Sequence, residues 1–318
     1  MRKNSTILVT GGTGSFGQKF VEIALKELDP KEIRVFSRGE LLQKEMSERF
    51  SDPRIIFYIG DVRDKEAVRK VVQGCDLVVH AAALKHIPIA EENPSETIKT
   101  NIGGSFNVIM SAIEAEVEKV IAISSDKAVK PVNLYGATKM CMEKLIIQAN
   151  MHQSKTSLSC VRYGNVVGSR GSLIYYLIQN PKRVLLTDER MTRFWLTLEQ
   201  GVQFVLKSID RMVGGEIFIP NPPSMKVRSL IETLCLNTEI YVTGIRPGEK
   251  LNEELISIEE STHSFRFEDG TYMIIPEIAT GRTYIRNVEH EKEFSYNSGE
   301  NEKWLTPDEM MNLSRHLT

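Results

Sequence analysis

The chain has 318 residues, of which 41% are hydrophobic and 26% are charged, and its formal net charge is -2 at pH 7. This length is sufficient to bury a core without disulfides, and the near-neutral charge excludes a strong general attraction to nucleic acid or to anionic membranes. No apolar run approaches the roughly 20 residues of a membrane-spanning helix. The four cysteines have no zinc-site spacing. We therefore expect a soluble cytoplasmic protein with reduced thiols and no metal.

Short apolar runs alternate with helical patterns in the first half of the chain. The runs are continuously apolar, which is typical of strands that are covered on both faces of a parallel sheet. From Phe20 to Leu28 the apolar residues recur at helical spacing, which predicts a crossover helix. The predicted strands are residues 6–10, 32–37, 54–60, 76–83, 119–124 and 157–168. This order predicts the α/β class, with a Rossmann-type doubly wound parallel sheet.

The regular alternation ends at about residue 170. Beyond it, residues 198–212 predict a helix and residues 216–220 a short strand, separated by turns that contain Pro and Gly. We therefore expect two domains. The first covers residues 1–168 and binds a cofactor. The second is a smaller α/β lobe with the C-terminal tail, over residues 169–318, of which roughly 190–215 packs back on the first domain.

A glycine-rich loop, VTGGTGSFGQKF, joins the first predicted strand to the first helix. Gly11, Gly14 and Gly17 permit a tight turn and a close approach of the backbone to a pyrophosphate, which the N-terminus of the helix then binds. The alternative is a tight turn without a ligand. Three glycines at this spacing, between a strand and a helix, favour a dinucleotide site instead.

The second predicted strand ends with Ser37 and Arg38, without the acidic residue that usually binds the ribose of NAD. A guanidinium and a hydroxyl suit a 2'-phosphate, so this end of the strand favours NADP. The alternative is that Arg38 is a solvated surface charge. The residues expected to contact the cofactor are Gly11, Thr13, Gly14, Ser15, Phe16, Gly17, Ser37, Arg38, Asp61, Val62, Ala81, Ala82, Lys85, Tyr135 and Lys139.

The stretch ISSDKAVKPVNLYGATK carries the candidate catalytic residues. Tyr135 and Lys139 are four residues apart and share one helix face, and an ammonium near a phenol favours the phenolate. Ser125, at the end of the fifth predicted strand, can bind a substrate hydroxyl that loses its proton. This set predicts reversible removal of a hydride from a secondary alcohol.

Asp126 and Lys127 follow directly after the strand-end serines. Hydride transfer alone does not need this additional acid and amine. A solvated ion pair in a surface turn is the alternative that composition favours. The pair nevertheless lies at the carboxyl edge of the sheet, where α/β proteins bind their ligands, so we expect it to take part in catalysis.

The order of T-G-x-x-G-x-x-G, strand-end serine and Y-x-x-x-K resembles the extended short-chain dehydrogenase/reductase family. More narrowly, the chain resembles the inverting UDP-N-acetylglucosamine 4,6-dehydratases of pseudaminic acid biosynthesis, in register from about residue 6 to the tail. The stretches that carry this resemblance include TGGTGSFG, AALKHIPIAEENP, SSDKAVKPVNLYGATK, VRYGNVVGSRGS and GIRPGEKLNEELI.

The resemblance implies oxidation at C4 of the sugar, loss of water across C5 and C6, and return of the same hydride to C6. It implies that Tyr135 takes the C4 hydroxyl proton, Asp126 protonates the departing C6 hydroxyl and Lys127 removes the C5 proton. Lys127 could act as a base only if burial or a neighbouring cation lowered its pKa.

Retaining relatives carry a carboxylate where Lys127 stands, so inversion at C5 is expected here. The alternatives are a dehydratase that retains C5 or releases the 5,6-alkene, an epimerase for another UDP-sugar, and a catalytically silent NADP-binding sensor.

The resemblance also implies how the substrate, UDP-N-acetylglucosamine, is bound and how the chain assembles. Arg193 could bind a phosphate or pack on Trp195. The resembled enzymes are hexamers, so a homo-oligomer, possibly a hexamer, is expected. The implied substrate contacts are Lys85, Asn165, Arg170, Thr187, Arg246 and Glu249.

Overall fold

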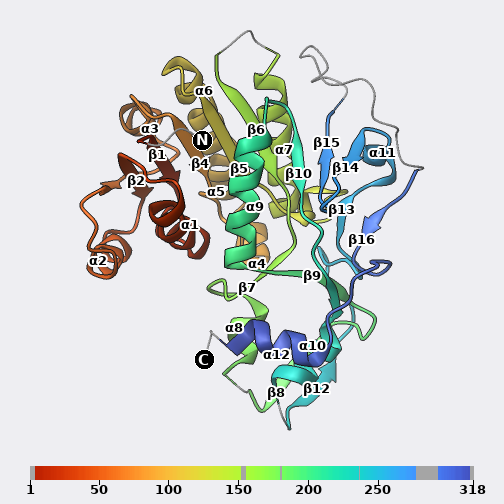
Figure 1. Ribbon diagram of the computed structural model, residues 1–318. Helices are drawn as coiled ribbons and strands as arrows, with labels where there is room; N and C mark the ends of the chain where they lie inside the picture. Colours follow the sequence, from red (N-terminus) through yellow and green to blue (C-terminus); the bar gives the residue numbers. More distant parts are fainter. Residues whose placement is uncertain (1–3, 152–154, 180, 236, 277–292, 316–318) are drawn as a thin grey trace.

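The apolar runs of the first half form adjacent parallel strands of one large sheet (Figure 1). The computed structural model describes residues 4–151, 155–179, 181–235, 237–276 and 293–315. The nine strands follow the order β14-β15-β10-β6-β5-β4-β1-β2-β3, with parallel pairing from β3 to β10. The predicted doubly wound parallel sheet is confirmed. Its first six strands are β1 (Thr6–Thr10), β2 (Glu32–Ser37), β3 (Ile55–Ile59), β4 (Leu77–His80), β5 (Lys119–Ile123) and β6 (Ser157–Val161).

Helices cover both faces of this sheet, which explains why its strands are apolar at successive positions. Ile7 and Val9 of β1 pack in a core with α1 (Ser15–Glu27) and α9 (Leu198–Arg211). Leu8 points the other way, into a second core. The helices that contribute to the second core are α3 (Lys65–Val72), α6 (Gly104–Glu114) and α7 (Leu134–Ala149).

The predicted strand over residues 157–168 is two strands that belong to different sheets. Its first part is β6, whereas β7 (Asn165–Val167) pairs with β9 (Thr192–Thr197) in a three-stranded sheet with β11 (Ser224–Lys226). Gly164 lies between the two parts, where a Cβ would come within 2.6 Å of the Cβ of Phe194. Both parts are apolar, so the sequence pattern does not show where the chain leaves the large sheet.

Strands from the second half of the chain extend the large sheet beyond β6. β10 (Ile217–Ile219) pairs parallel with β6, and β15 (Tyr272–Ile274) and β14 (Ser264–Arg266) follow it in antiparallel pairing. Helix α9 packs on α1. The three strands, however, also belong to the first sheet, so the chain crosses between the lobes more often than a division at residue 168 implies.

The smaller lobe surrounds a third hydrophobic core, which contains Trp195, Leu230 and Met310 (Figure 1). Within the described part of the chain, no helix is both long and apolar enough to cross a membrane. The elements of this lobe are α8 (Leu173–Leu177), β8 (Arg183–Leu186), α10 (Val227–Leu234), β12 (Glu239–Val242) and α12 (Pro307–Ser314).

Short elements complete the edges of the two lobes. Beside β4 and α7 lie α4 and α5, and a π-helical turn leads from α5 into α6. On the other side, β13 pairs with β16 in a separate two-stranded sheet. The remaining elements are α2 (Glu40–Arg49), α4 (Ile87–Glu92), α5 (Pro94–Ile98), the π-helical turn (Lys99–Gly103), β13 (Glu254–Ile256), α11 (Ile258–Ser261) and β16 (Tyr296–Asn297).

A buried ion network joins the sheet to the C-terminal part of the chain. The side chain of Arg162, which follows β6, is only 1% exposed and donates to Glu143 on α7 at 2.6 Å and to Glu260 on α11 at 2.9 Å. Glu143 also accepts a hydrogen bond from the hydroxyl of Ser124 at 2.5 Å. Since an unpaired buried charge is strongly unfavourable, these contacts hold α7 and α11 in place around β6.

We expect Arg162→Ala to lower the free energy of unfolding by about 3 kcal/mol or more, because Glu143 would remain buried without its cation. Urea denaturation followed by circular dichroism measures the change. The control is Arg190→Ala, which removes an exposed ion pair with Asp188 and should leave the unfolding midpoint unchanged. Equal effects of the two substitutions would contradict a stabilising role for the network.

Candidate functional site

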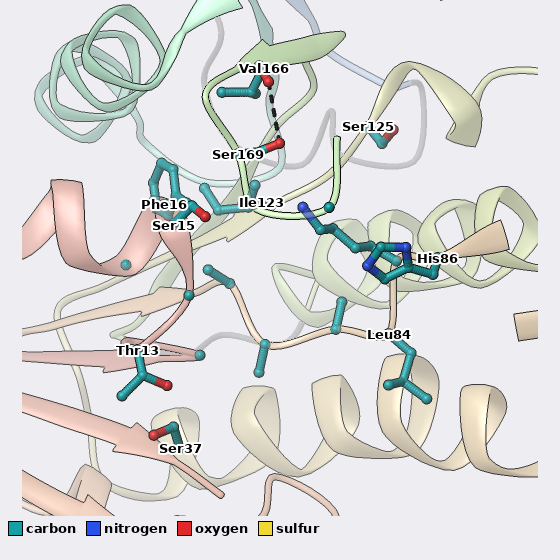
Figure 2. A pocket seen from close by; sticks show the side chains of 18 of the residues that line it. Thr13, Ser15, Phe16, Ser37, Leu84, His86, Ile123, Ser125, Val166 and Ser169 are labelled. Carbon is teal, nitrogen blue, oxygen red and sulfur yellow. Dashed lines mark hydrogen bonds between the residues drawn. The ribbon is translucent and has the colours of Figure 1, made fainter. Parts of the chain in front are cut away.

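A cavity of about 850 Å³ opens at the carboxyl ends of the parallel strands. Its size is typical of sites for small molecules and cofactors. Figure 2 shows Thr13 and Ser37 at one end of the cavity and Ser125 and His86 at the other. Each of the fifteen residues predicted to contact the cofactor belongs to its lining. The site therefore extends from the glycine loop to the Tyr-Lys pair of α7.

The glycine loop forms a cradle at the N-terminus of α1. Gly11 has a φ of 67°, and a Cβ at this position would lie 2.8 Å from the backbone nitrogen of Ala82, so only glycine fits the turn. Gly14 is the N-cap of α1 and provides no side chain to cap the first turn. The free N-H groups of that turn therefore suit the phosphates of a dinucleotide.

At the end of β2, Arg38 is 54% exposed and its guanidinium lies 3.7 Å from Asp61. Asp61 has a closer partner in Arg63, at 2.6 Å. Because Arg63 already compensates the carboxylate, the positive charge of Arg38 remains available to an anion. The hydroxyl of Ser37 beside it accepts a hydrogen bond from Gln43 at 3.0 Å.

Helix α7 begins directly against the short 3-10 turn η2 (Asp126–Ala128). A Cβ at Gly136 would collide with the carbonyl oxygen of Lys127, so glycine allows this close approach. Asn133 caps the helix by accepting a hydrogen bond from the backbone of Gly136 at 2.8 Å. The packing places Tyr135, in the first turn of α7, beside Asp126 and Lys127.

Lys139 is buried and Tyr135 is partly buried in this wall of the cavity. The ammonium of Lys139 donates to the carbonyl of Ile123 at 2.7 Å, and burial lowers the pKa of Lys139 to about 8. Burial raises the pKa of Tyr135, against the opposing effects of the Lys127 charge and the Ser125 hydroxyl. The spacing of Tyr135 and Lys139 predicted that the Lys139 ammonium favours the phenolate, whereas in the structure the cation that favours it is Lys127.

Asp126 is completely buried at the strand end. Its Oδ1 accepts hydrogen bonds from Ser125 at 2.9 Å and from Lys127 at 3.0 Å, while Oδ2 has no partner in the part of the chain that the structure describes. Burial raises the pKa of the carboxyl above its usual value, although the Lys127 charge opposes this effect. An acid in this environment can hold a proton for transfer to a leaving group.

Lys127 lies between two carboxylates, and the second one was not anticipated. Its Nζ is 3.4 Å from Oε1 of Glu253, a buried residue that precedes β13. Burial by itself would lower the pKa of Lys127, but Asp126 and Glu253 outweigh burial and raise it. The condition stated for a lysine base, a lowered pKa, is therefore not met in this arrangement, and a neutral amine on Lys127 requires transfer of its proton to Asp126 along their hydrogen bond. The stretch GEKLNEEL contains several acids, and nothing in the sequence distinguishes Glu253 as the partner of Lys127.

Arg193 holds the segment that carries Glu253, which is neither of the two roles considered from the sequence. Its guanidinium donates to the carbonyls of Leu251 at 3.0 Å and Lys250 at 3.1 Å, and Nε lies 3.7 Å from Glu253. The ammonium of Lys250 donates to the carbonyl of Val129 at 2.5 Å, just beyond η2. The segment from Lys250 to Glu253 is thus packed against the catalytic turn.

A family model described as "Polysaccharide biosynthesis protein" matches residues 7–276 of the chain. The chain belongs to this family. A relative from Campylobacter jejuni subsp. jejuni serotype O:23/36, named UDP-N-acetylglucosamine 4,6-dehydratase (inverting), is 45% identical, and the match covers 99% of each chain. The resemblance predicted from the sequence motifs is thereby confirmed.

Two further comparisons describe the breadth of this polysaccharide biosynthesis family. A relative from Rickettsia felis named UDP-glucose 4-epimerase is 39% identical, over 99% of this chain and 96% of its own. The X-ray structure of Pen from Bacillus thuringiensis matches with a TM-score of 0.90 and 35% identity, over 99% of this chain and 98% of that one. The family fold thus extends over nearly the whole chain.

The structure separates the predicted substrate residues of this family member into two groups. Lys85 and Asn165 line the cavity, and Oδ1 of Asn165 is buried without a partner among the described residues. Arg170 lies against the glycine loop, where its backbone N-H donates to Ser15 at 3.0 Å and its guanidinium donates to the carbonyl of Thr13. Arg170 is therefore placed toward the cofactor end of the site.

The other three predicted substrate residues, like Arg170, lie outside the lining of this cavity. Thr187 is buried and donates to the sulfur of Met191 at 2.9 Å. Arg246 and Glu249 belong to the exposed loop that reaches the catalytic helix through Gly248, whose carbonyl accepts from Asn133 at 2.9 Å. Their contact with a substrate stays a prediction from the resemblance.

The lowered pKa of Lys139 predicts a pH-dependent contribution to stability. Between pH 8 and the usual lysine value of 10.5, the unfolded chain binds the larger number of protons, so the penalty of burying Lys139 decreases as pH rises. From pH 7 to pH 10 we expect the wild type to gain about 2 kcal/mol of unfolding free energy relative to Lys139→Met.

Urea denaturation at each pH measures this difference, with Lys26→Met on the solvent side of α1 as the matched control. If the difference in unfolding free energy between wild type and Lys139→Met stayed constant over this pH range, the pKa of Lys139 would not be lowered in the folded protein.

Proposed function

We propose that this protein is an NADP-dependent UDP-N-acetylglucosamine 4,6-dehydratase that inverts C5. The product is UDP-2-acetamido-2,6-dideoxy-β-L-arabino-hex-4-ulose, the first intermediate of pseudaminic acid-type sugars. The observation that carries the proposal is the pair of the buried Asp126 and the partly buried Lys127, 3.0 Å apart, next to Tyr135 at the cavity. The Campylobacter relative of the same name supports the choice of substrate.

The residues at the cavity suit a nicotinamide dinucleotide. The glycine cradle and the N-terminus of α1 would hold its pyrophosphate, Arg38 and Ser37 its 2'-phosphate, and Lys139 its ribose. A bound nicotinamide ring would accept the hydride from C4 of the sugar and return it at C6. The chain itself must bind and orient both molecules, exclude water and move four protons: one from the C4 hydroxyl, one from C5, one to the departing C6 hydroxyl and one back to C5 after the hydride returns.

Tyr135 takes the C4 hydroxyl proton in the oxidation step. Its pKa is raised by burial, so the phenolate depends on the nearby positive charge of Lys127 and on the hydroxyl of Ser125. The ketone formed at C4 then acidifies the proton on C5, which prepares the elimination.

Elimination requires the proton on Asp126 and a neutral amine on Lys127. One proton shift along the 3.0 Å hydrogen bond converts the resting ion pair into this acid and base without solvent. Lys127 then takes the C5 proton, the C5-C6 double bond forms, and the C6 hydroxyl leaves as water with the Asp126 proton. The elimination restores the ion pair, and burial favours the neutral pair that begins it.

The second candidate is a UDP-sugar 4-epimerase, in view of the Rickettsia relative with that name. Oxidation at C4 with Tyr135 and Lys139 would be sufficient for that reaction. The epimerase reaction would not use the Asp126 carboxyl as an acid or the Lys127 amine as a base. A catalytically silent sensor is disfavoured because Ser125, Tyr135 and Lys139 all line the same cavity.

Incubation with UDP-N-acetylglucosamine and NADP in deuterated water, followed by NMR of the sugar, tests the proposal. We expect a 4-keto-6-deoxy product with deuterium at C5 and inverted configuration. Asp126→Asn should lower turnover at least 100-fold, because the departing hydroxyl loses its proton donor. Asp188→Asn, at an exposed ion pair outside the cavity, is the control. Formation of a C4 epimer, or no consumption of the sugar, would reject the proposed function.

The choice of NADP predicts that Arg38→Ala weakens NADP binding about tenfold and leaves NAD binding unchanged, because only NADP carries the 2'-phosphate. Isothermal titration with each cofactor measures both affinities. The control is Arg49→Ala, since Arg49 pairs with Glu22 and lies over the ring of Phe50 instead of lining the cavity. An equal loss for NAD and NADP would exclude this role of Arg38.

A further inference from the structure

A second carboxylate, that of Glu253, belongs to the charge cluster of Asp126 and Lys127. Oε1 of Glu253 lies 3.4 Å from the Lys127 ammonium and 3.7 Å from the Arg193 guanidinium. Its Oε2 is buried with no hydrogen-bond partner among the residues that the structure describes. The backbone N-H of Glu253 donates to the hydroxyl of Ser298 at 3.0 Å, which fixes the main chain at this point.

The ionisable groups around Lys127 come from four parts of the chain. Asp126 is its neighbour in η2, and Tyr135 faces it from α7. Arg193 comes from β9, and Glu253 and Lys250 come from the segment before β13. The charges of the two buried acids, Asp126 and Glu253, are compensated by the partly buried cations Lys127 and Arg193, and Lys250 adds a further positive charge.

We propose that Glu253 is a positioning residue, which holds Lys127 against Asp126 and sets the pH range in which this pair carries a single proton. The inference rests on the proposed function, in which Asp126 is the acid and Lys127 the base of the elimination. Glu253 itself touches neither reacting atom of the sugar in this scheme and acts through Lys127.

Glu253 affects the pH range because the elimination depends on the number of protons that Asp126 and Lys127 carry together. With one proton, the pair can shift it from Lys127 to Asp126 and become acid and base; with two protons there is no base, and with none there is no acid. A fixed negative charge 3.4 Å from the ammonium favours the protonated forms of both groups. Glu253 therefore moves both limits of the active pH range upward.

Glu253 remains ionised while the Asp126-Lys127 pair carries a single proton. Burial would favour its neutral form, but the charges of Lys127, Arg193 and Lys250 outweigh burial and lower its pKa below the usual value. Arg193 is itself fixed by the carbonyls of Lys250 and Leu251. The counter-charge thus stays in place while the proton moves within the Asp126-Lys127 pair.

The test compares the pH dependence of kcat for dehydration in wild type and Glu253→Gln. The wild type should give a bell-shaped profile, and both limbs should move to lower pH by about one unit in Glu253→Gln. Glu253→Asp keeps the charge, so it should restore the position of the limbs even if its shorter side chain lowers kcat. The matched control is Glu254→Gln, because the adjacent carboxylate accepts from Ser295 at 2.6 Å and should leave the profile unchanged.

Each outcome decides the question. Lower kcat with unshifted limbs in Glu253→Gln, or an equal shift in Glu254→Gln, would overturn the role of Glu253. If Glu253→Gln does not fold, Arg193→Gln provides a second test, because it removes a positive charge near Lys127 instead of a negative one. Both limbs of the pH profile should then move to higher pH. Unshifted limbs in Arg193→Gln would also overturn the role of Glu253. A wild type that forms no 4-keto sugar rejects the proposed function instead, before any variant is compared.

Discussion

The burial of the Asp126 carboxylate at the end of β5 is the constraint on which the site depends. A carboxylate in this position needs compensation, and the surrounding elements provide it. Ser125 and Lys127 donate to one oxygen, and the start of α7 packs closely enough to bring Tyr135 beside them. Glu253 and Arg193 then balance the charge of Lys127. The same low-dielectric surroundings give Asp126 a raised pKa, which suits an acid.

Two buried charge clusters connect the large sheet to the same C-terminal segment. One joins Lys127 to Glu253. The other joins Arg162 to Glu260 and to Glu143, which accepts a hydrogen bond from the Ser124 hydroxyl. β13 and the first residues of α11 lie between Glu253 and Glu260 in the chain. Docking of this segment and formation of the candidate site are therefore linked, because neither set of charges is compensated unless the segment is in place.

The two ends of the cavity differ in what builds them. At the cofactor end, the glycine loop and the residues that end β2 are local in sequence, so their arrangement follows from a strand, a turn and a helix. At the catalytic end, η2, α7, β9 and the segment before β13 must all meet. The residues that the sequence assigned to the first end accordingly all line the cavity, while at the second end the sequence grouped only residues that are neighbours in the chain.

The sequence alone determined the parallel sheet, the glycine cradle and the grouping of Asp126 and Lys127 with Tyr135, because each depends on periodicity or on short spacing. Only the tertiary structure decided that the run after residue 157 divides between two sheets, that β10, β14 and β15 extend the first sheet, and that Glu253 faces Lys127. These features depend on contacts between distant parts of the chain. The direction of the Lys127 pKa belongs with them, since burial and opposite charges act against each other and only the distances show which prevails.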